Sequence, residues 1–562
     1  MTTKRIGFSL VPGAKALFTS EFVAYLTALH DRFTSRVLAL REKRAHVLDQ
    51  ALNERVPPSH LPTSEANTGD WRVPPVPPEL TAPGIEITGP ASITGMFINA
   101  LNPGPGGSRA AGDLDDDEDA GGHRFVDTVT AALNRLAAVE RTLTYTNPDT
   151  GKHYNIQDGD LPFFMHREKG LHLDEPEVTI DGAPVPAAIL GTALTLFHAG
   201  RAQIERGQGV FFYLPKMESA EEAGFWREFF DFSAEHLRLP ENAIIRGIPL
   251  VESLPAAYQM EEMLYELGPY AAGLNAARWD FKASIFEFII TDPDSVWPDR
   301  FGVDIKTTDF LANIFRRLVA VCLKRGAVPI GGMATALPSR DDEVNRFAAA
   351  SIKGDKEWEA RQGFLRAWVA HIFHMDTAAR PFKELRGSGW TPSAEMADPD
   401  NFPIEIKVPD GPITMEGTRR NARMVIEYLE GWLNGRGARG IDSLEGKPGV
   451  HPPLMEDLAT GRMSVAQIAQ RIIHGAADSD TGETHDSTLV KRLLAEELDA
   501  ILALREKQIA DAEELAATGE RYRKACKIAM RWVRNYTELD FRSLGSYSRA
   551  DLDDIAAAPD AF

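Results

Sequence analysis

A strand–helix–strand pattern in residues 244–280 constrains the fold of this chain more than any other feature. It opens with an apolar run, IIRGIPLVE, that ends in the carboxylate Glu252. From Met260 onward, apolar residues at i, i+3, i+4 and i+7 indicate an amphipathic helix. A second short run, GLNAARWDF, then brings up Asp280. A crossover of this length is typical of two parallel neighbouring strands.

The two carboxylates of this segment, Glu252 and Asp280, are expected to lie side by side. Neighbouring strands are about 4.8 Å apart, and parallel α/β proteins place their chemistry at the carboxyl ends of the strands. Two hard oxygen ligands with room for water and substrate suit Mg²⁺. The pattern predicts a magnesium site here, although acidic residues at strand ends are also common without a metal.

Short apolar runs alternate with helical patterns over the middle of the chain, from residue 86 to residue 395, which predicts a parallel α/β fold. A (β/α)8 TIM barrel fits this length better than a doubly wound sheet, because no GxGxxG motif follows an early strand. The runs that we predict as strands are VFFYLPK (210–216), IIRGIPLVE (244–252), SIFEFII (284–290), AVPIGGM (327–333) and AWVAHIF (367–373).

The two ends of the chain carry helical patterns instead. Residues 14–53 are predicted as two helices, and a proline cluster in residues 57–90 is predicted as a linker. The pattern is almost wholly helical beyond residue 405, most clearly in residues 488–514. We therefore expect three domains: a helical N-terminal domain (1–85), the barrel (86–395) and a helical C-terminal domain (396–562).

Two segments have the composition of loops. Residues 102–122 combine Gly, Pro and a run of acids, which predicts a solvated flexible loop. Residues 476–486 are predicted as a plain exposed loop.

Charge and cysteine content exclude several classes of protein. The chain has 61 Lys and Arg against 82 Asp and Glu, a formal charge of −21, which argues against a nucleic-acid or anionic-membrane surface. Only Cys322 and Cys526 occur, so neither a disulfide framework nor a cysteine metal site is plausible. We find no cleavable leader and no uninterrupted apolar run long enough to span a membrane, so we expect a cytoplasmic protein.

Other polar residues could take part in chemistry, and each also has a simpler explanation. The segment FFMHREKGLHL gathers Arg167 and Lys169, which could stabilise an enolate or bind a carboxylate, or belong to a charged loop. Lys216 could meet an anionic ligand or lie at the surface. Asp457, in LMED, could cap the helix that follows or act as a general base. The acidic run that holds Glu118 and Asp119 could supply ligand oxygens or be solvated.

Taken together, the order and spacing of several motifs resemble malate synthase, specifically the shorter A-type enzymes. The resemblance covers residues 90 to 475 and implies a TIM barrel with an N-terminal helical clasp and a C-terminal helical plug. It also implies Mg²⁺-dependent condensation of acetyl-CoA with glyoxylate to malate and CoA, a step of the glyoxylate cycle. The motifs are FFYLPKMES, LVESLPAAYQMEEMLYEL, GLNAARWDF, KRGAVPIGGMATALPSRDDEVN, GFLRAWVAH, MVIEYLEGWLNG and LMEDLATGRMSVAQI.

The resemblance also assigns roles to individual residues. Glu252 and Asp280 match the Mg²⁺ ligands, and Asp457 matches the base that removes a methyl proton from acetyl-CoA. The cationic group against the enolate oxygen is expected from Lys169 or Arg167. The partners implied are small-molecule substrates, and we expect a monomer that binds neither nucleic acid nor membrane. Residues expected at the substrate are Ala277, Arg278, Trp279, Glu118 and Asp119.

Departures from the family pattern lie near the expected active site. Where the family reads RPRGWHL this chain reads REKGLHL, so the family's arginine aligns with Lys169. Ala277 replaces a glycine that allows close approach of substrate. These changes leave two alternatives open: an enzyme that condenses or cleaves a different acyl-CoA and 2-oxo acid pair, or a catalytically weak paralogue. Retention of Glu252, Asp280 and Asp457 argues against an inactive protein.

Overall fold

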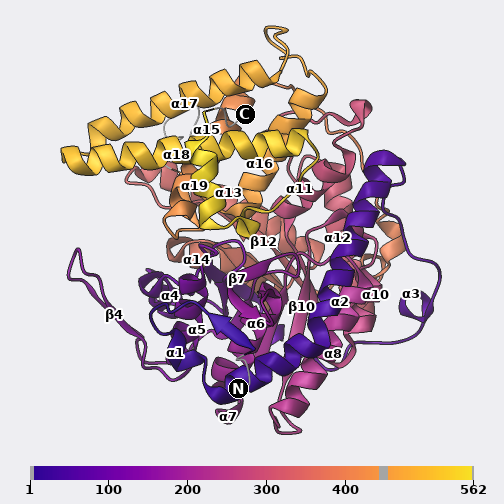
Figure 1. Ribbon diagram of the computed structural model, residues 1–562. Coiled ribbons are helices and arrows are strands. Elements are labelled where there is room, and N and C mark those ends of the chain that lie inside the picture. The colour runs from indigo at the N-terminus through magenta and orange to yellow at the C-terminus, as the bar shows by residue number, and fades with distance from the viewer. Residues whose placement is uncertain (1–4, 442–452, 560–562) are drawn as a thin grey trace.

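The structure is a computed structural model that describes residues 5–441 and 453–559 (Figure 1). At its centre, eight parallel strands close into a barrel in the order β10-β11-β12-β13-β2-β3-β6-β9. The predicted TIM barrel is therefore confirmed. The strands are β2 (Gly84–Gly89), β3 (Gly112–Asp116), β6 (Phe163–Arg167), β9 (Val210–Leu214), β10 (Ile245–Val251), β11 (Gly273–Ala276), β12 (Val328–Ala334) and β13 (Arg366–Val369).

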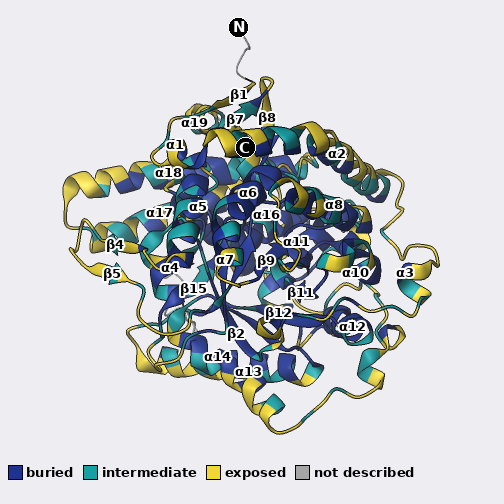
Figure 2. Ribbon diagram, turned by 90° about the horizontal axis from the view of Figure 1, so that it is seen from below, coloured by how far each residue is buried: buried dark blue, intermediate teal, exposed yellow. Residues whose placement is uncertain are grey.

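The barrel interior is filled by side chains that alternate along the strands. Residues such as Leu114, Met165, Ile248 and Ile330 form an apolar cluster inside it, while their neighbours in sequence face the surrounding helices. Figure 2 shows the strands as a buried centre with exposed residues at the rim of the molecule. The interior of the barrel is therefore filled, and a cavity for substrate is expected at an end of the barrel.

Helices cover the outside of the barrel and follow its strands in the expected βα alternation. We find α10 where the apolar spacing predicts it, and it ends at Gly268. The covering helices are α4 (Thr94–Leu101), α5 (Phe125–Val139), α6 (Ala187–Thr195), α8 (Ala220–His236), α10 (Met260–Leu267), α11 (Arg278–Ile289), α12 (Asp309–Arg325), α13 (Asp342–Gln362) and α14 (Met375–Gly387).

Two strand predictions are wrong in part or in whole. The run SIFEFII (284–290) lies in helix α11, not in a strand. This helix is buried on nearly all sides because it packs against α16 (Leu458–Ile473), so its apolar run lacks the polar face that identifies a helix. The run AWVAHIF (367–373) forms strand β13 only as far as Val369 and then turns into a short 3-10 helix.

Segment 102–122 is an exposed loop only in its first part, as residues 105–108 are exposed; its acid-rich part contains β3, a fully buried barrel strand. Its acids have specific partners, since Asp115 and Asp117 pair with Arg135 of α5 at 2.6 and 3.0 Å. Asp116 pairs with Arg167 of the next strand at 2.5 Å. Composition predicts solvation because it counts the charges without the cations that neutralise them.

Residues 14–53 form two helices, as predicted, but of very unequal length: the single turn α1 (Ala14–Leu17) and the long helix α2 (Ser20–Asn53). The N-terminus of α2 is capped by Thr19, and it packs along α6 and α8 on one side of the barrel (Figure 1). Phe22, Leu29 and Phe33 are among the side chains that it buries. The first barrel strand begins at Gly84, so the end of the segment 57–90 belongs to the barrel and not to the predicted linker. The division into three domains at residues 85 and 395 stays a prediction.

The C-terminal helices form a separate layer over one end of the barrel (Figure 1). Of these, α16 packs against α11 of the barrel and against α15 and α18 of its own layer. Residues 476–486 form neither a helix nor a strand, as predicted, apart from one isolated bridge. The helices are α15 (Met415–Leu433), α16, α17 (Ser487–Gln508), α18 (Ala512–Thr537) and α19 (Arg549–Ala557).

Cys322 and Cys526 are both buried as free thiols, as expected. Within residues 5–441 and 453–559, no helix has both the length and the apolar composition needed to cross a membrane.

Candidate active site

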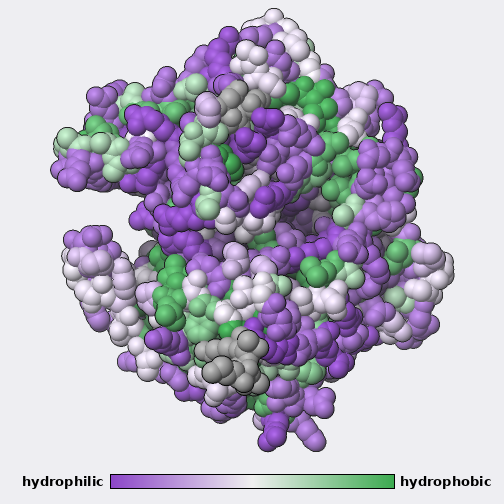
Figure 3. Space-filling view, in the orientation of Figure 1, coloured by the Kyte–Doolittle hydropathy of each residue, from purple (hydrophilic) through white to green (hydrophobic). Residues whose placement is uncertain are grey.

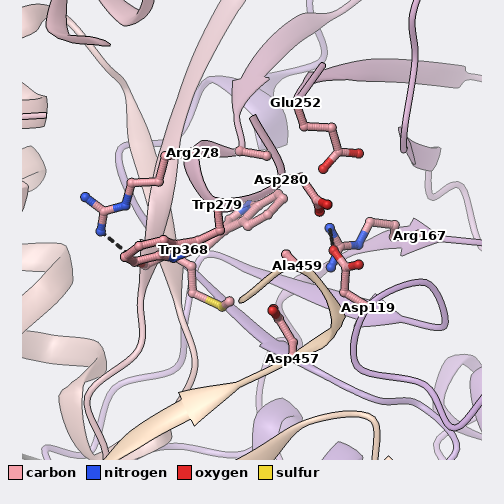
Figure 4. Close-up of a pocket in the computed structure, with 11 residues that line it drawn as sticks. Asp119, Arg167, Glu252, Arg278, Trp279, Asp280, Trp368, Asp457 and Ala459 are labelled. Carbon is pink, nitrogen blue, oxygen red and sulfur yellow. Dashed lines mark hydrogen bonds and ion pairs between the residues drawn. The ribbon is translucent and has the colours of Figure 1, made fainter. Parts of the chain in front are cut away.

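A cavity of about 330 Å³ lies at the carboxyl ends of the barrel strands (Figure 4). The ends of strands β6, β10, β11, β12 and β13 contribute to its wall, and the start of α16 closes it from the C-terminal layer. This is the end of a TIM barrel at which chemistry takes place. The lining residues are Asp119, Arg167, Glu252, Ala277, Arg278, Trp279, Asp280, Met333, Trp368, Asp457 and Ala459.

Three buried carboxylates converge in this cavity. Asp119, Glu252 and Asp280 each offer an oxygen, and these oxygens lie within 4.8 Å of one another. Glu252 directly follows β10 and Asp119 comes shortly after β3. Asp280 lies in the first turn of α11 rather than at the end of a strand, which still brings it beside Glu252. Glu252 and Asp280 thus lie together, as the sequence predicts, and Asp119 was predicted either to supply a ligand oxygen or to lie at the substrate.

Buried carboxylates this close together resist ionisation unless a cation offsets them. Burial raises the pKa of Glu252 to about 7, although Lys216 opposes the shift. Burial acts on Asp280 in the same sense, but Lys216 and Arg462 outweigh it and hold the pKa of Asp280 below its ordinary value. Glu252 Oε2 has no hydrogen-bond partner among the described residues. The cluster is therefore short of positive charge.

Arg167, the last residue of β6, holds a fixed position beside the carboxylates. Its guanidinium donates two hydrogen bonds to Asp116, at 2.8 and 2.5 Å, and lies 3.3 Å from Asp119. The Asp116 carboxylate also accepts from the backbone N–H groups of Glu118 and Ala120, both at 2.9 Å. The loop that carries Asp119 is therefore attached to the same carboxylate as Arg167.

Asp457 enters the cavity from the C-terminal layer (Figure 4). It is the N-cap residue of α16, and its side chain accepts a hydrogen bond from Thr460 N at 3.3 Å. Burial, followed by the nearby carboxylates of Asp119 and Asp280, raises the pKa of Asp457 well above its usual range. The two readings of Asp457 from sequence are thus compatible: it caps the helix and presents a carboxylate of raised basicity to the cavity.

Comparison with known proteins decides the family. The family models "Malate synthase, TIM barrel domain" and "Malate synthase, C-terminal" match residues 163–394 and 412–549. Malate synthase of Streptomyces clavuligerus is 35% identical over 552 residues, 96% of each chain. Malate synthase A of Escherichia coli is 34% identical over 509 residues, 89% of this chain and 91% of the relative. The enzyme of Myxococcus xanthus is 35% identical over 491 residues, 87% and 86% of the two chains.

The chain belongs to the malate synthase family. The resemblance, the enzyme class and the malate synthase function predicted from the motifs are thereby confirmed. The family also implies a divalent metal, for which the convergent carboxylates provide oxygen ligands.

The residues expected at the substrate lie at different depths. Ala277, Arg278 and Trp279 all line the cavity. Arg278 donates to the Met333 carbonyl at 3.0 Å, which fixes it against the wall. Glu118 is fully buried and does not line the cavity; its carboxylate accepts a hydrogen bond from Lys216 Nζ at 2.9 Å.

Lys169, one of the two residues expected to supply the cationic group, lies away from the cavity. Its ammonium is 3.1 Å from Glu175 and donates to the His123 carbonyl at 3.2 Å. Arg167, two residues earlier on the strand, lines the cavity instead. Alternate residues along an extended segment can face the same side, so sequence alignment alone does not separate these two candidates.

Three residues that line the cavity were not predicted from the sequence: Trp368, Met333 and Ala459. Trp368 and Met333 both occur in apolar runs that we interpreted only as strands. A tryptophan near the carboxyl end of a predicted barrel strand was the available signal for Trp368. Lys216, considered as a ligand for an anionic substrate, instead contacts the carboxylates of the protein itself.

Proposed function

We propose that this cavity is the site at which acetyl-CoA condenses with glyoxylate, after which water hydrolyses the thioester to release malate and CoA. The observation that carries the proposal is the meeting of two groups from different layers. The carboxylate cluster and Arg167 come from the barrel, and Asp457 comes from α16 of the C-terminal layer. One set holds and activates the 2-oxo acid, and the other removes the proton.

The residues present fit a magnesium ion. Asp119, Glu252 and Asp280 supply hard carboxylate oxygens, and Glu252 Oε2 has no hydrogen-bond partner among the described residues. We therefore assign Glu252 and Asp280 as ligands, as the motifs predict, and add Asp119. When bound, Mg²⁺ supplies Lewis acidity toward the carbonyl of the 2-oxo acid.

Asp457 is proposed to remove the proton from the acetyl-CoA methyl group. A thioester methyl is a very weak acid, so the base needs a raised pKa, and the negative charge that develops on the thioester oxygen needs a fixed cation. Burial and the neighbouring carboxylates raise the pKa of Asp457. Its place at the N-cap of α16 keeps the carboxylate at one position.

Arg167 is proposed to stabilise the enolate oxygen. It faces the same cavity as Asp457, and its two bonds to Asp116 fix the direction of the guanidinium before substrate arrives. Lys169 is already engaged with Glu175, so we assign it a structural role. Arg167, and not Lys169, then supplies the positive charge that the family pattern places beside the enolate oxygen.

A hollow of about 1770 Å³ beside Met455 is proposed to receive the nucleotide end of acetyl-CoA. Strand β15 (Leu454–Glu456) leads from it directly to Asp457. Its wall combines apolar side chains with four arginines, the residue type suited to phosphate groups, although Arg439 and Arg521 pair with Glu430 of the same wall. Figure 3 shows the surface indented on this side, between the C-terminal helices and the β4 (Thr144–Thr146) and β5 (His153–Asn155) hairpin. The arginines are Arg436, Arg439, Arg505 and Arg521.

Release of the CoA thiol from acetyl-CoA tests this function. We expect release to require both glyoxylate and Mg²⁺, and malate to accumulate in equal amount. Thiol release without glyoxylate would indicate a simple thioesterase. No release with both present would contradict the proposal.

A further inference from the structure

Lys216 is an unusual lysine because it is buried among the carboxylates of the proposed metal site. It follows β9, and its backbone has a φ of 52°, the left-handed region that non-glycine residues seldom adopt. Its backbone N–H donates to the Glu252 carboxylate. The backbone conformation therefore fixes both the start of the side chain and one of the metal-site carboxylates.

The ammonium of Lys216 contacts every member of the carboxylate cluster. Its Nζ lies 3.0 Å from Asp119, 2.5 Å from Asp280 and 3.6 Å from Glu252. It also lies 2.9 Å from Glu118, behind the cluster. An ammonium has three donors, and here each is met by a carboxylate oxygen. One lysine thus stands among oxygens of the kind that a divalent cation needs.

The charges around this ammonium do not balance. Four buried carboxylates surround the single positive charge of Lys216. Two arginines also reach this cluster, and each is shared with a further carboxylate: Arg462, 2.9 Å from Asp280, with Glu287, and Arg167, 3.3 Å from Asp119, with Asp116. A purely structural ion pair needs only one partner of each sign. The surplus of carboxylates indicates a site that a second cation completes.

Lys216 also has a place to which its side chain can move. It lines a separate cavity of about 1050 Å³ on the far side of Glu252, between α2, the barrel and the C-terminal helices. The wall of that cavity holds the carboxylates of Glu218 and Glu287 together with Arg41, Arg44 and Arg462, and Glu287 is paired with Arg462. The flexible four-carbon stem of lysine allows its ammonium to leave the carboxylate cluster toward that cavity.

We propose that Lys216 is a resident counter-cation of the metal site: its ammonium neutralises the carboxylates before a divalent cation binds, and then moves toward the adjoining cavity. Lys216 would stabilise the metal-free protein and weaken the affinity for Mg²⁺, because the two cations compete for the same oxygens. The inference rests on the proposed function only in taking this cluster as the metal site.

Substitution Lys216→Met removes the charge and keeps much of the length of the side chain. We expect the metal-free variant to melt at a lower temperature than the wild type, and addition of Mg²⁺ to close most of that gap. Calorimetric titration with MgCl₂ should give a Kd at least about tenfold lower than that of the wild type, because a competing charge is gone. Neither measurement depends on turnover.

Lys169→Met is the matched control. Lys169 is also buried and paired with a carboxylate, Glu175, but it lies outside the cluster. We expect it to lower the melting temperature without changing the affinity for Mg²⁺. An unchanged or weaker affinity in Lys216→Met would overturn the inference. A wild type that binds no Mg²⁺ at all would instead refute the proposed metal site, and the inference with it.

A measurement on the wild type avoids dependence on the folding of any variant. If Mg²⁺ displaces the ammonium into the larger cavity, an amine-reactive reagent should modify Lys216 faster with MgCl₂ than without it. Mass spectrometry of the peptide that contains Lys216 gives the rate, with Lys169 as the internal reference. Equal rates with and without Mg²⁺ would contradict the displacement.

Discussion

The guanidinium of Arg167 lies over the ring of Trp368, with its central carbon 5.3 Å from the ring centroid. The indole ring of Trp368 is itself fixed by hydrogen bonds, because its Nε1 donates to Glu86 at 3.2 Å and to the Tyr213 hydroxyl at 3.0 Å. Glu86 is completely buried in the barrel and is paired with Arg366. The polar residues inside the barrel therefore fix the orientation of the Trp368 ring, which contacts Arg167, the residue proposed to stabilise the enolate.

Removing the aromatic ring of Trp368 should slow the reaction without changing the affinity for Mg²⁺. We expect Trp368→Leu to lower kcat about tenfold, because the cation–π contact with Arg167 is lost. Trp368→Phe keeps an aromatic face and should lose less. Steady-state kinetics with a parallel Mg²⁺ titration checks both. Equal losses in the two variants would show that the ring face does not matter.

The choice between Arg167 and Lys169 can be tested with exchanges that keep the charge. Arg167→Lys loses the two-pronged bond to Asp116 and should lower kcat by at least about tenfold. Lys169→Arg keeps the charge beside Glu175 and leaves the cavity wall unchanged, so kcat should change less than about twofold. Turnover at saturating acetyl-CoA and glyoxylate gives both values. A larger loss in Lys169→Arg would return the role to Lys169.

Asp457→Asn should separate catalysis from folding. Asparagine caps a helix about as well as aspartate, so α16 should keep its N-terminus, but an amide cannot take a proton. We expect kcat to fall at least about a hundredfold, with the melting temperature and the Mg²⁺ affinity near those of the wild type. Glu456→Gln, at the buried neighbouring acid, is the control. Normal turnover in Asp457→Asn would exclude it as the base.

The barrel was predictable from sequence because its signal is local and repeated. The strands at 210–216, 244–252 and 327–333 are short apolar runs between helical patterns, and the structure has β9, β10 and β12 there. Glu252 was placed correctly for the same reason: it ends such a run. Helix α11 and strand β3 were missed because their patterns depend on burial and on partners elsewhere in the chain.

The site was predictable in its members more than in its geometry. Motif spacing brings Glu252, Asp280 and Asp457 to one place, and the structure has all three in the wall of one cavity. A motif does not show in which direction a side chain near the end of a strand points, so the sequence could not distinguish Lys169 from Arg167 as the cationic group. The contacts of Lys216 depend on a left-handed backbone at one residue, for which the sequence gives no local signal.

Acid stability should depend on His374. This side chain is 1% exposed, and burial, followed by the nearby His371, lowers the pKa of His374 to about 4. In the unfolded chain a histidine titrates near 6.5. Between these values only the unfolded state takes up the proton, so stability is full above about pH 6.5 and is lost as the pH falls toward 4. Denaturant unfolding across this range should show a shallower loss in His374→Gln than in the wild type; parallel curves would contradict this.

The choice of 2-oxo acid should respond to one methyl group. Ala277 lines the cavity at the N-cap of α11, where the family has glycine. We expect Ala277→Gly to raise the ratio of kcat/KM for pyruvate to that for glyoxylate several-fold, since one methylene in a pocket is worth about 1–3 kcal/mol. A panel of 2-oxo acids of increasing size, assayed with wild type and variant, measures the trend. Matched rates across the panel would mean that the methyl group does not limit the space for substrate, and that specificity is set by other walls of the cavity, such as Met333 and Trp368.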